Sequence, residues 1–172
     1  MNGKLRNMTS IYLLNENNQI LLLYRIGSRV ANNKYVGSAG GHFEEGELND
    51  AKKCVLRELQ EETNLGIDDI SDLQLKYVTL RYKNEEIRQI YSFFAKLVDS
   101  DKKIISNEGN LEWFNYDEIS KLDMPHTAKY VVEHFINEGR KNSLLYGGIS
   151  TAEGVEFTEL KDFWNIYYWH LT

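Results

Sequence analysis

The sequence lacks cysteine pairs and long apolar runs, and each absence excludes a class of protein. Cys54 is the single cysteine, so no intrachain disulfide and no cysteine-based zinc cluster can form from this chain. The longest apolar stretch, residues 20–24, is far too short to span a bilayer. Residues 1–8 also lack the apolar run of a targeting segment. We therefore expect a cytoplasmic protein without a membrane partner.

Excess positive charge is also missing. The 20 Lys and Arg residues face 26 Asp and Glu residues, and the formal net charge is −6. This balance offers no electrostatic footprint for a nucleic-acid polymer, so we do not expect one as a partner. An acidic protein that acts on phosphates needs a local device against charge repulsion, and a bound divalent cation is the usual one. The length of 172 residues with 42% hydrophobic residues is sufficient for one domain over residues 1–172.

The apolar pattern predicts strands and helices in alternation. Residues 8–14 and 20–26 form one expected strand pair, and residues 73–81 and 87–98 form a second, each joined by a polar turn. Between them, the glycine-rich stretch 27–46 cannot be a regular element and predicts a long functional loop. A helix should run from Asn49 or Asp50, which can cap it, to about Thr63, because Asn64 and Gly66 follow.

The rest of the chain predicts shorter elements. A strand is expected at 111–114, a short helix at 116–122, a longer helix at 127–137 after Pro125, and a hairpin from 143–149 and 155–160. Residues 163–169 are too aromatic to be left in water, so the tail should dock on the domain or on a partner subunit. The C-terminal region 143–172 is thus expected to pack on the domain as a hairpin and an aromatic tail.

Acidic side chains gather on one face of the helix expected at 50–63. At about 100° per residue, Glu58, Glu61 and Glu62 share a narrow arc. Such like-charge spacing is mildly unfavourable, and a hard divalent cation would relieve it, with magnesium as the natural candidate. The alternative interpretation is an ordinary solvated surface helix, because residues 57–62 are all good helix formers. The order of strands, Gly-Gly turn, acidic loop and capped helix favours the metal site.

These residues resemble the signature of the Nudix family: Gly, five residues, Glu, seven residues, then Arg-Glu-apolar-x-Glu-Glu-x-Gly-apolar. The matching positions are Gly41, Glu47, Arg57, Glu58, Leu59, Glu61, Glu62 and Leu65. Two positions depart from it: nine residues separate Glu47 from Arg57, and Asn64 stands where the family usually has Gly. Asn can adopt the left-handed conformation that Gly serves there. Residues 107–114 further resemble a loop and strand of mutator-type nucleotide pyrophosphohydrolases.

The resemblance implies an α/β fold, an α/β/α sandwich around a mixed β-sheet. It implies magnesium-dependent hydrolysis, with Mn²⁺ as the alternative ion, in which metals neutralise charge and help to deprotonate the attacking water. By position, Glu61 and Glu62 are the central metal ligands, and Glu58 is a ligand or base. Arg57 would orient Glu61 or its neighbour. The carbonyl of Gly41 would add a ligand.

The resemblance also implies roles outside the helix. Glu108 either joins the metal site, as ligand or base, or is a solvated loop carboxylate; both interpretations stay open. Gly40, Gly41 and Glu47 are expected to contact the substrate. Tyr35 and Trp113 either stack on a base or, the favoured interpretation, pack in the core.

The implied substrate is a small nucleotide bound by a monomer or a homodimer. The leading hypothesis is a nucleoside triphosphate, including an oxidised one of the 8-oxo-dGTP type, cleaved to monophosphate and pyrophosphate. ADP-ribose or a nucleotide sugar is the alternative, because the signature binds only the shared pyrophosphate. A non-catalytic nucleotide sensor is disfavoured, since such a protein should have lost some of the signature glutamates, all of which are present.

Overall fold

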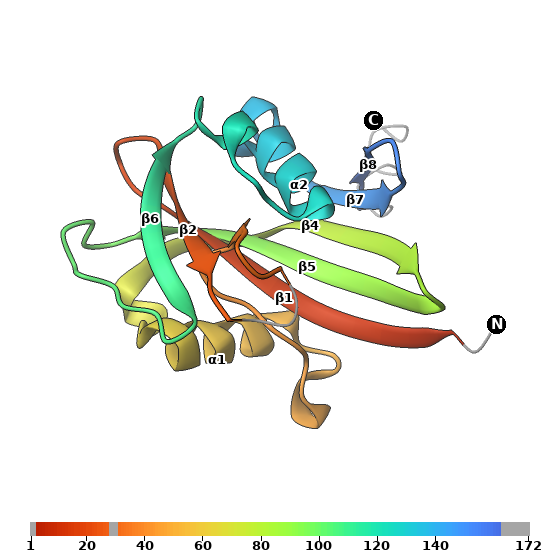
Figure 1. Cartoon of the computed structure of the whole chain (residues 1–172), viewed down its shortest axis with the longest axis horizontal. Helices are drawn as coiled ribbons and strands as arrows, with labels where there is room; N and C mark the ends of the chain where they lie inside the picture. The colour runs from red at the N-terminus through yellow and green to blue at the C-terminus, as the bar shows by residue number, and fades with distance from the viewer. Residues whose placement is uncertain (1–2, 28–30, 163–172) are drawn as a thin grey trace, which may run out of the picture.

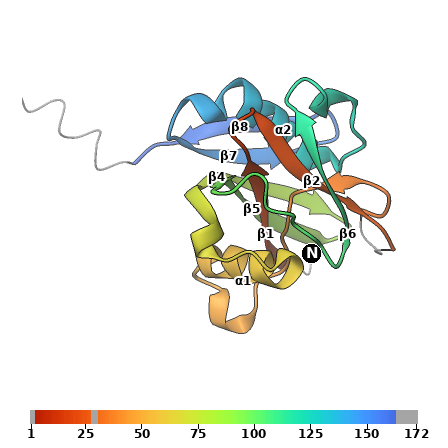
Figure 2. The same cartoon turned by 90° about the vertical axis from the view of Figure 1, so that its left-hand side faces the viewer.

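The computed structural model of the chain describes residues 3–27 and 31–162. These residues form one mixed sheet of eight strands: β1 (Lys4–Leu14), β2 (Gln19–Arg25), β3 (Tyr35–Val36), β4 (Ile70–Lys83), β5 (Glu86–Leu97), β6 (Gly109–Asn115), β7 (Leu145–Ser150) and β8 (Val155–Leu160). Helix α1 (Ala51–Thr63) lies on one face of the sheet and helix α2 (His126–Asn137) on the other (Figures 1 and 2). This is the expected α/β/α sandwich.

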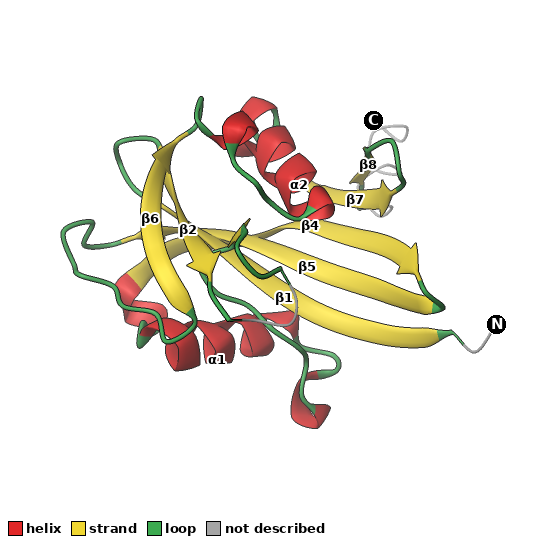
Figure 3. Cartoon of the chain, in the orientation of Figure 1, coloured by secondary structure: helices red, strands yellow, loops and turns green. Residues whose placement is uncertain are grey.

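The strands follow the order β3-β2-β1-β5-β4-β7-β8, and β6 pairs with β2. Strand β1 is parallel to β5, and β4 is parallel to β7, whereas the other pairs are antiparallel. Four short 3-10 turns complete the described elements: Glu45–Glu47, Ile67–Asp69, Ile119–Lys121 and Gly139–Lys141 (Figure 3). The sheet is therefore mixed, as predicted.

Alternation along the strands divides the core into two layers. Ile11 and Leu13 of β1 pack in the cluster that holds Val55 and Leu59 of α1. Tyr12, between them in sequence, packs with the buried residues of α2 on the opposite side. Successive side chains of a strand point to opposite faces, so one apolar strand serves both layers. This burial holds α1 in a defined rotation against the sheet.

Most predicted elements are confirmed, although their limits differ. Strand β1 begins at Lys4 rather than residue 8, because its polar start is paired with β5 in the register Lys4↔Glu86. The prediction of a loop without regular structure at 27–46 is wrong in part, since β3 pairs with β2 and two isolated bridges join the loop to β1. The helix expected at 116–122 is only the 3-10 turn Ile119–Lys121.

The predicted C-terminal hairpin is confirmed as β7 and β8, which extend the sheet beyond β4. The aromatic residues 163–169 lie outside the described residues. One domain over 1–172 therefore stays a prediction. Within the described ranges, no helix combines the length and apolar character that crossing a bilayer requires.

Candidate active site

Helix α1 begins and ends where its sequence predicts. The Asp50 side chain accepts a hydrogen bond from the Lys53 amide at 2.9 Å and caps the first turn. Asn64 ends the helix with φ of 58°, the left-handed conformation that asparagine tolerates. Val55 and Leu59 are fully buried against the sheet, and the acidic residues Glu58 and Glu62 lie on the side of α1 that faces the glycine turn.

A glycine turn passes between β1 and α1. The Ile11 amide donates to the Ala39 carbonyl at 2.9 Å, and the Thr9 amide donates to the Gly41 carbonyl at 2.8 Å. Gly40 has φ of 152°, and a Cβ there would lie 2.4 Å from the Thr9 carbonyl oxygen. Only glycine therefore lets the loop run this close to β1.

Gly41 leaves room for a carboxylate. A Cβ at Gly41 would lie 2.4 Å from Oε1 and 2.6 Å from Oε2 of Glu58. The missing side chain thus creates a cradle for the acidic group, as the glycine in the signature suggests. Since the Gly41 carbonyl already accepts a hydrogen bond from Thr9, its role as a metal ligand stays a prediction.

Glu58 and Glu62 are buried carboxylates at this turn. Their exposed fractions are only 9% and 8%. Oε2 of Glu62 accepts a hydrogen bond from the Gly40 amide at 3.1 Å. Burial, followed by the negative charge of Glu108, raises the pKa of Glu62 to about 8. Burial also raises the pKa of Glu58. Two desolvated carboxyl groups with few donors form an oxygen site that a hard cation would stabilise.

Arg57 connects the acidic groups around the turn. Its Nε and Nη2 donate to the two carboxylate oxygens of Glu47 at 2.8 and 2.9 Å. Its Nη1 lies 2.9 Å from Glu58 Oε1 and 3.0 Å from Glu61 Oε2. Nη2 also donates to the His42 carbonyl at 3.0 Å. The guanidinium group lowers the pKa of Glu47 to about 2. Arg57 therefore contacts Glu47, Glu58 and Glu61, and its role in orienting the carboxylates stays a prediction.

The acidic trio expected from helical spacing is divided in space. The Glu61 side chain is 56% exposed and shares Arg57 Nη1 with Glu58, whereas Glu58 and Glu62 are buried. Across the described ranges, no group of three or more His, Cys, Asp or Glu side chains is close enough to hold a metal ion. Arg57 draws Glu61 outward, so the role of Glu61 as a central ligand stays a prediction.

Glu108 joins the site from a distant segment. The preceding Asn107 donates from its side chain to the Glu61 carbonyl at 3.2 Å, and its amide donates to the Glu62 carbonyl at 3.4 Å. These bonds anchor the loop before β6 to the end of α1. The Glu108 carboxylate forms an ion pair with Arg25 and lines the same cleft as Glu62. Glu108 thus lies in the same cleft as Glu62, and its role as a metal ligand or base stays a prediction.

Arg25 is a site residue that the sequence reasoning missed. It is the last residue of β2, and the register Arg25↔Gly109 brings it beside Glu108. Its Nε is buried and has no hydrogen-bond partner in the described part of the chain. No local motif marks it, since the pairing of β2 with β6 alone brings it there.

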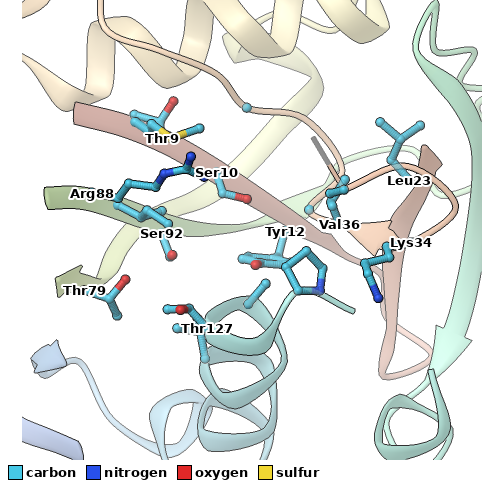
Figure 4. Close-up of a pocket in the computed structure, with 18 of the residues that line it drawn as sticks. Thr9, Ser10, Tyr12, Leu23, Lys34, Val36, Thr79, Arg88, Ser92 and Thr127 are labelled. Carbon is cyan, nitrogen blue, oxygen red and sulfur yellow. The ribbon is translucent and has the colours of Figure 1, made fainter. Parts of the chain in front are cut away.

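A cleft of about 460 Å³ opens on the α2 side of the sheet, next to these carboxylates. Its lining includes Glu62, Glu108 and Gly40 together with the start of α2. Figure 4 shows Ser10 and Tyr12 of β1, Ser92 of β5 and Thr127 of α2 around the same space. This volume is within the usual range for a small-molecule site.

The family follows from a match that covers most of the chain. Residues 4–135 match the family model described as the NUDIX domain. The chain belongs to the Nudix family. It is thus a Nudix pyrophosphohydrolase, an enzyme class that generally uses divalent metal ions. None of the curated protein sequences matches it significantly.

Solved structures share the Nudix fold. The mutator MutT protein from Bacillus halodurans is 23% identical with a TM-score of 0.62, over 91% of this chain and 95% of that one. MutT from Methanosarcina mazei Go1 is 19% identical with a TM-score of 0.63, over 80% and 97%. The NUDIX domain of Shewanella oneidensis NrtR, solved with ADP-ribose, is 13% identical with a TM-score of 0.63, over 81% and 89%. At these identities, the likeness shows the fold alone.

Of the five predicted substrate residues of this Nudix hydrolase, only Gly40 lines the cleft, whereas Gly41, Glu47, Tyr35 and Trp113 do not. Tyr35 packs against Tyr24 and Phe114, with ring centroids 4.9 Å away in each case. Trp113 packs against the core cluster that contains α1. Glu47 is 3% exposed and bound to Arg57. The arrangement favours packing for the two rings and a structural role for Glu47.

Proposed function

We propose that this Nudix hydrolase cuts the pyrophosphate bond of a small nucleoside diphosphate-linked molecule in a magnesium-dependent reaction. The preferred substrate is a nucleoside triphosphate, with oxidised triphosphates included, cleaved to monophosphate and pyrophosphate. One observation carries the proposal: two buried carboxylates, Glu58 and Glu62, lie beside a glycine turn, and Glu62 also lines a nucleotide-sized cleft.

Each site residue has a role in this proposal. Glu58 and Glu62 would hold the cation, with Glu61, Glu108 and the Gly41 carbonyl as further ligands. Bound Mg²⁺ supplies neutralisation of the phosphate charge and a lower pKa for the attacking water. Arg57 holds the carboxylates in place through its hydrogen bonds to Glu47 and Glu61. Arg25 lines the same cleft beside Glu108, where its guanidinium would bind phosphate oxygens.

ADP-ribose is the second candidate substrate, because the NUDIX domain of NrtR was solved in complex with it. A non-catalytic sensor is disfavoured, because the glutamates of the signature are all present. Chromatographic identification of products distinguishes these functions. Triphosphates, oxidised triphosphates, dinucleotides, nucleotide sugars and ADP-ribose are each incubated with Mg²⁺, with Mn²⁺ or with excess EDTA. Monophosphate and pyrophosphate should appear only with metal. If none of these compounds is cleaved, the proposal is contradicted.

Magnesium binding should release protons near neutral pH. Because the pKa of Glu62 is raised to about 8, this carboxyl is largely protonated at pH 7 and must lose its proton to bind a cation. We expect release of about one proton per cation at pH 7 and a metal affinity that rises between pH 6 and pH 8. Calorimetric titration in buffers of different ionisation enthalpy measures this release. It should disappear in Glu62→Gln. A binding heat independent of the buffer would contradict the prediction.

Adding one methyl group at Gly41 should damage the site more than the fold. In Gly41→Ala, the new Cβ would meet the Glu58 carboxylate at 2.4 to 2.6 Å, so the acidic group must move. We expect hydrolysis with Mg²⁺ to fall by about a hundredfold, a size typical of disturbed metal sites, while Tm changes by only a few degrees. Gly46→Ala is the control, because its Cβ would meet only Lys53 Nζ at 3.6 Å. Equal activity of both variants would argue against the cradle.

A further inference from the structure

The α2-facing side of the sheet carries positive charge that the proposed reaction does not use. Strand register places the arginines at 6, 88 and 81 side by side on β1, β5 and β4, with Lys4, Glu86 and Lys83 in the next row. Alternation puts all of them on the same face as Tyr12 and Phe94, which pack toward α2. We call Lys4, Arg6, Arg81, Lys83 and Arg88 the basic wall. This positively charged cluster occurs in a chain whose formal net charge is −6.

The basic wall is only partly neutralised. Glu86 pairs with Arg6 and Arg88 at 2.5 Å each. Arg81 and Lys83 have no carboxylate partner among the residues that the structure describes. Like charges directly opposite on neighbouring strands destabilise a sheet, so folding alone gives no reason for this arrangement. A bound anion would remove the repulsion.

A buried hydroxyl and a helix start lie next to the basic wall. Thr79 is 1% exposed, and its Oγ1 has no hydrogen-bond partner within the described ranges. Helix α2 begins after Pro125 without a side-chain cap or an acidic residue in its first turn. Arg88, Thr79 and Thr127 surround one space (Figure 4). Unpaired donors and the positive end of a helix both favour an anion.

We propose that this part of the cleft binds a second phosphate group of the substrate, away from the pyrophosphate that is cut. The inference rests on the proposed function and narrows its substrate class to nucleotides that carry a phosphate on the ribose in addition to the pyrophosphate. Arg81, Lys83 and Arg88 line the same cleft as Glu62 and Glu108, so one ligand can reach both ends. A cleft of this size suits one small ligand, so the second phosphate belongs on the nucleotide itself, as a ribose phosphomonoester. A nucleotide without it would leave Arg81, Lys83 and Thr79 unpaired.

Direct binding without metal tests this proposal. The probes are AMP, adenosine 3′,5′-bisphosphate, adenosine 2′,5′-bisphosphate and inorganic phosphate, each titrated by calorimetry into the whole chain. At least one bisphosphate should bind tenfold or more tightly than AMP, as expected for a charge-assisted contact, and this gain should shrink at high salt. The double variant Arg81→Gln/Lys83→Gln should lose the gain and keep AMP binding within about twofold. Lys52→Gln/Lys121→Gln, which changes the charge equally at exposed positions, should keep the gain.

A second variant tests the buried hydroxyl. Thr79→Val keeps the side-chain shape and removes the unpaired Oγ1, so the preference for the bisphosphate should fall by about threefold to tenfold. Its Tm should stay equal or rise, because an unsatisfied buried hydroxyl is lost. A purely structural role for Thr79 would leave the preference unchanged, and that result would remove Thr79 from the site.

Three outcomes would overturn the proposal: bisphosphates that bind no better than AMP, loss of the gain in the control variant, or inorganic phosphate that binds as tightly as a bisphosphate through Arg81 and Lys83. The third outcome would mean that Arg81 and Lys83 bind free inorganic phosphate instead of a phosphate group of the nucleotide. Because the titrations need neither metal nor turnover, they are independent of hydrolysis. Absence of hydrolysis with every substrate contradicts the proposed function, whereas equal binding of AMP and bisphosphates contradicts only the second phosphate site.

Discussion

Replacing Glu62 by glutamine should lower kcat for pyrophosphate hydrolysis by about a thousandfold. Loss of a charged ligand removes roughly 4 kcal/mol of the stabilisation that a bound cation gives the transition state. The fold should tolerate the change, because the glutamine oxygen can still accept the Gly40 amide hydrogen bond made by Glu62 Oε2. The free energy of unfolding should stay equal or rise, since Glu62, whose pKa is raised to about 8 in the folded protein, must take up a proton on folding at pH 7 and glutamine need not.

Steady-state kinetics with Mg²⁺ and thermal unfolding measure these two effects. Glu156→Gln in β8 is the matched control, because Glu156 is exposed on a strand that does not line the cleft. Glu61→Gln tests whether Glu61 also binds the cation, since its side chain is exposed and lies beside Arg57. We expect a loss of at least tenfold if Glu61 turns inward to a cation. Full activity in both variants would refute the metal assignment.

Replacing Arg57 by alanine should lower the free energy of unfolding by about 3 to 5 kcal/mol, because the buried Glu47 would lose its partner. Lys52→Ala on the exposed side of the same helix is the control and should change stability by less than about 0.5 kcal/mol. Adding Glu47→Gln to Arg57→Ala should recover part of the loss, since no buried charge remains. Urea unfolding of the wild type, Arg57→Ala, Glu47→Gln and the double variant measures the coupling between the two residues. A simple sum of the two single effects would contradict it.

The same ion pair should make stability depend on pH. The pKa of Glu47 falls from 4.5 to about 2 in the folded protein, so its contribution is complete above pH 4.5. It is lost as the pH falls toward 2, because the unfolded chain then binds a proton before the folded one does. Arg57→Ala should lack this part of the pH dependence. Unfolding curves collected between pH 2 and pH 6 give the free energy of unfolding at each pH. If the interpretation is wrong, this free energy will change equally with pH in the wild type and in Arg57→Ala.

Net charge was a poor guide to the local surface of this protein. The value of −6 averages over the whole molecule. Lys4 and Arg6 lie far from Arg81 and Lys83 in sequence, yet β1 and β4 both pair with β5. The basic wall therefore emerges only from strand register, which a count of charges does not contain.

The sequence by itself determined the elements whose causes are local. The limits of α1 depend on Asp50 and Asn64 at its ends, and the two core layers depend on strict alternation within strands such as β1. Contacts a few residues apart follow from helix and strand geometry alone. For this reason the limits of α1 and the position of the glycine turn could be predicted, whereas the sandwich fold was predicted from the resemblance to the Nudix family.

Only the tertiary structure decided which distant residues meet. Arg25 reaches Glu108 because β2 pairs with β6, and Glu61 turns to Arg57 while Glu58 and Glu62 are buried. Helical spacing alone treats these three glutamates alike. Which of them is buried depends on the glycine loop that β1 holds against α1. Long-range pairing is selected by the packing of the whole core, and no short segment of the chain encodes it.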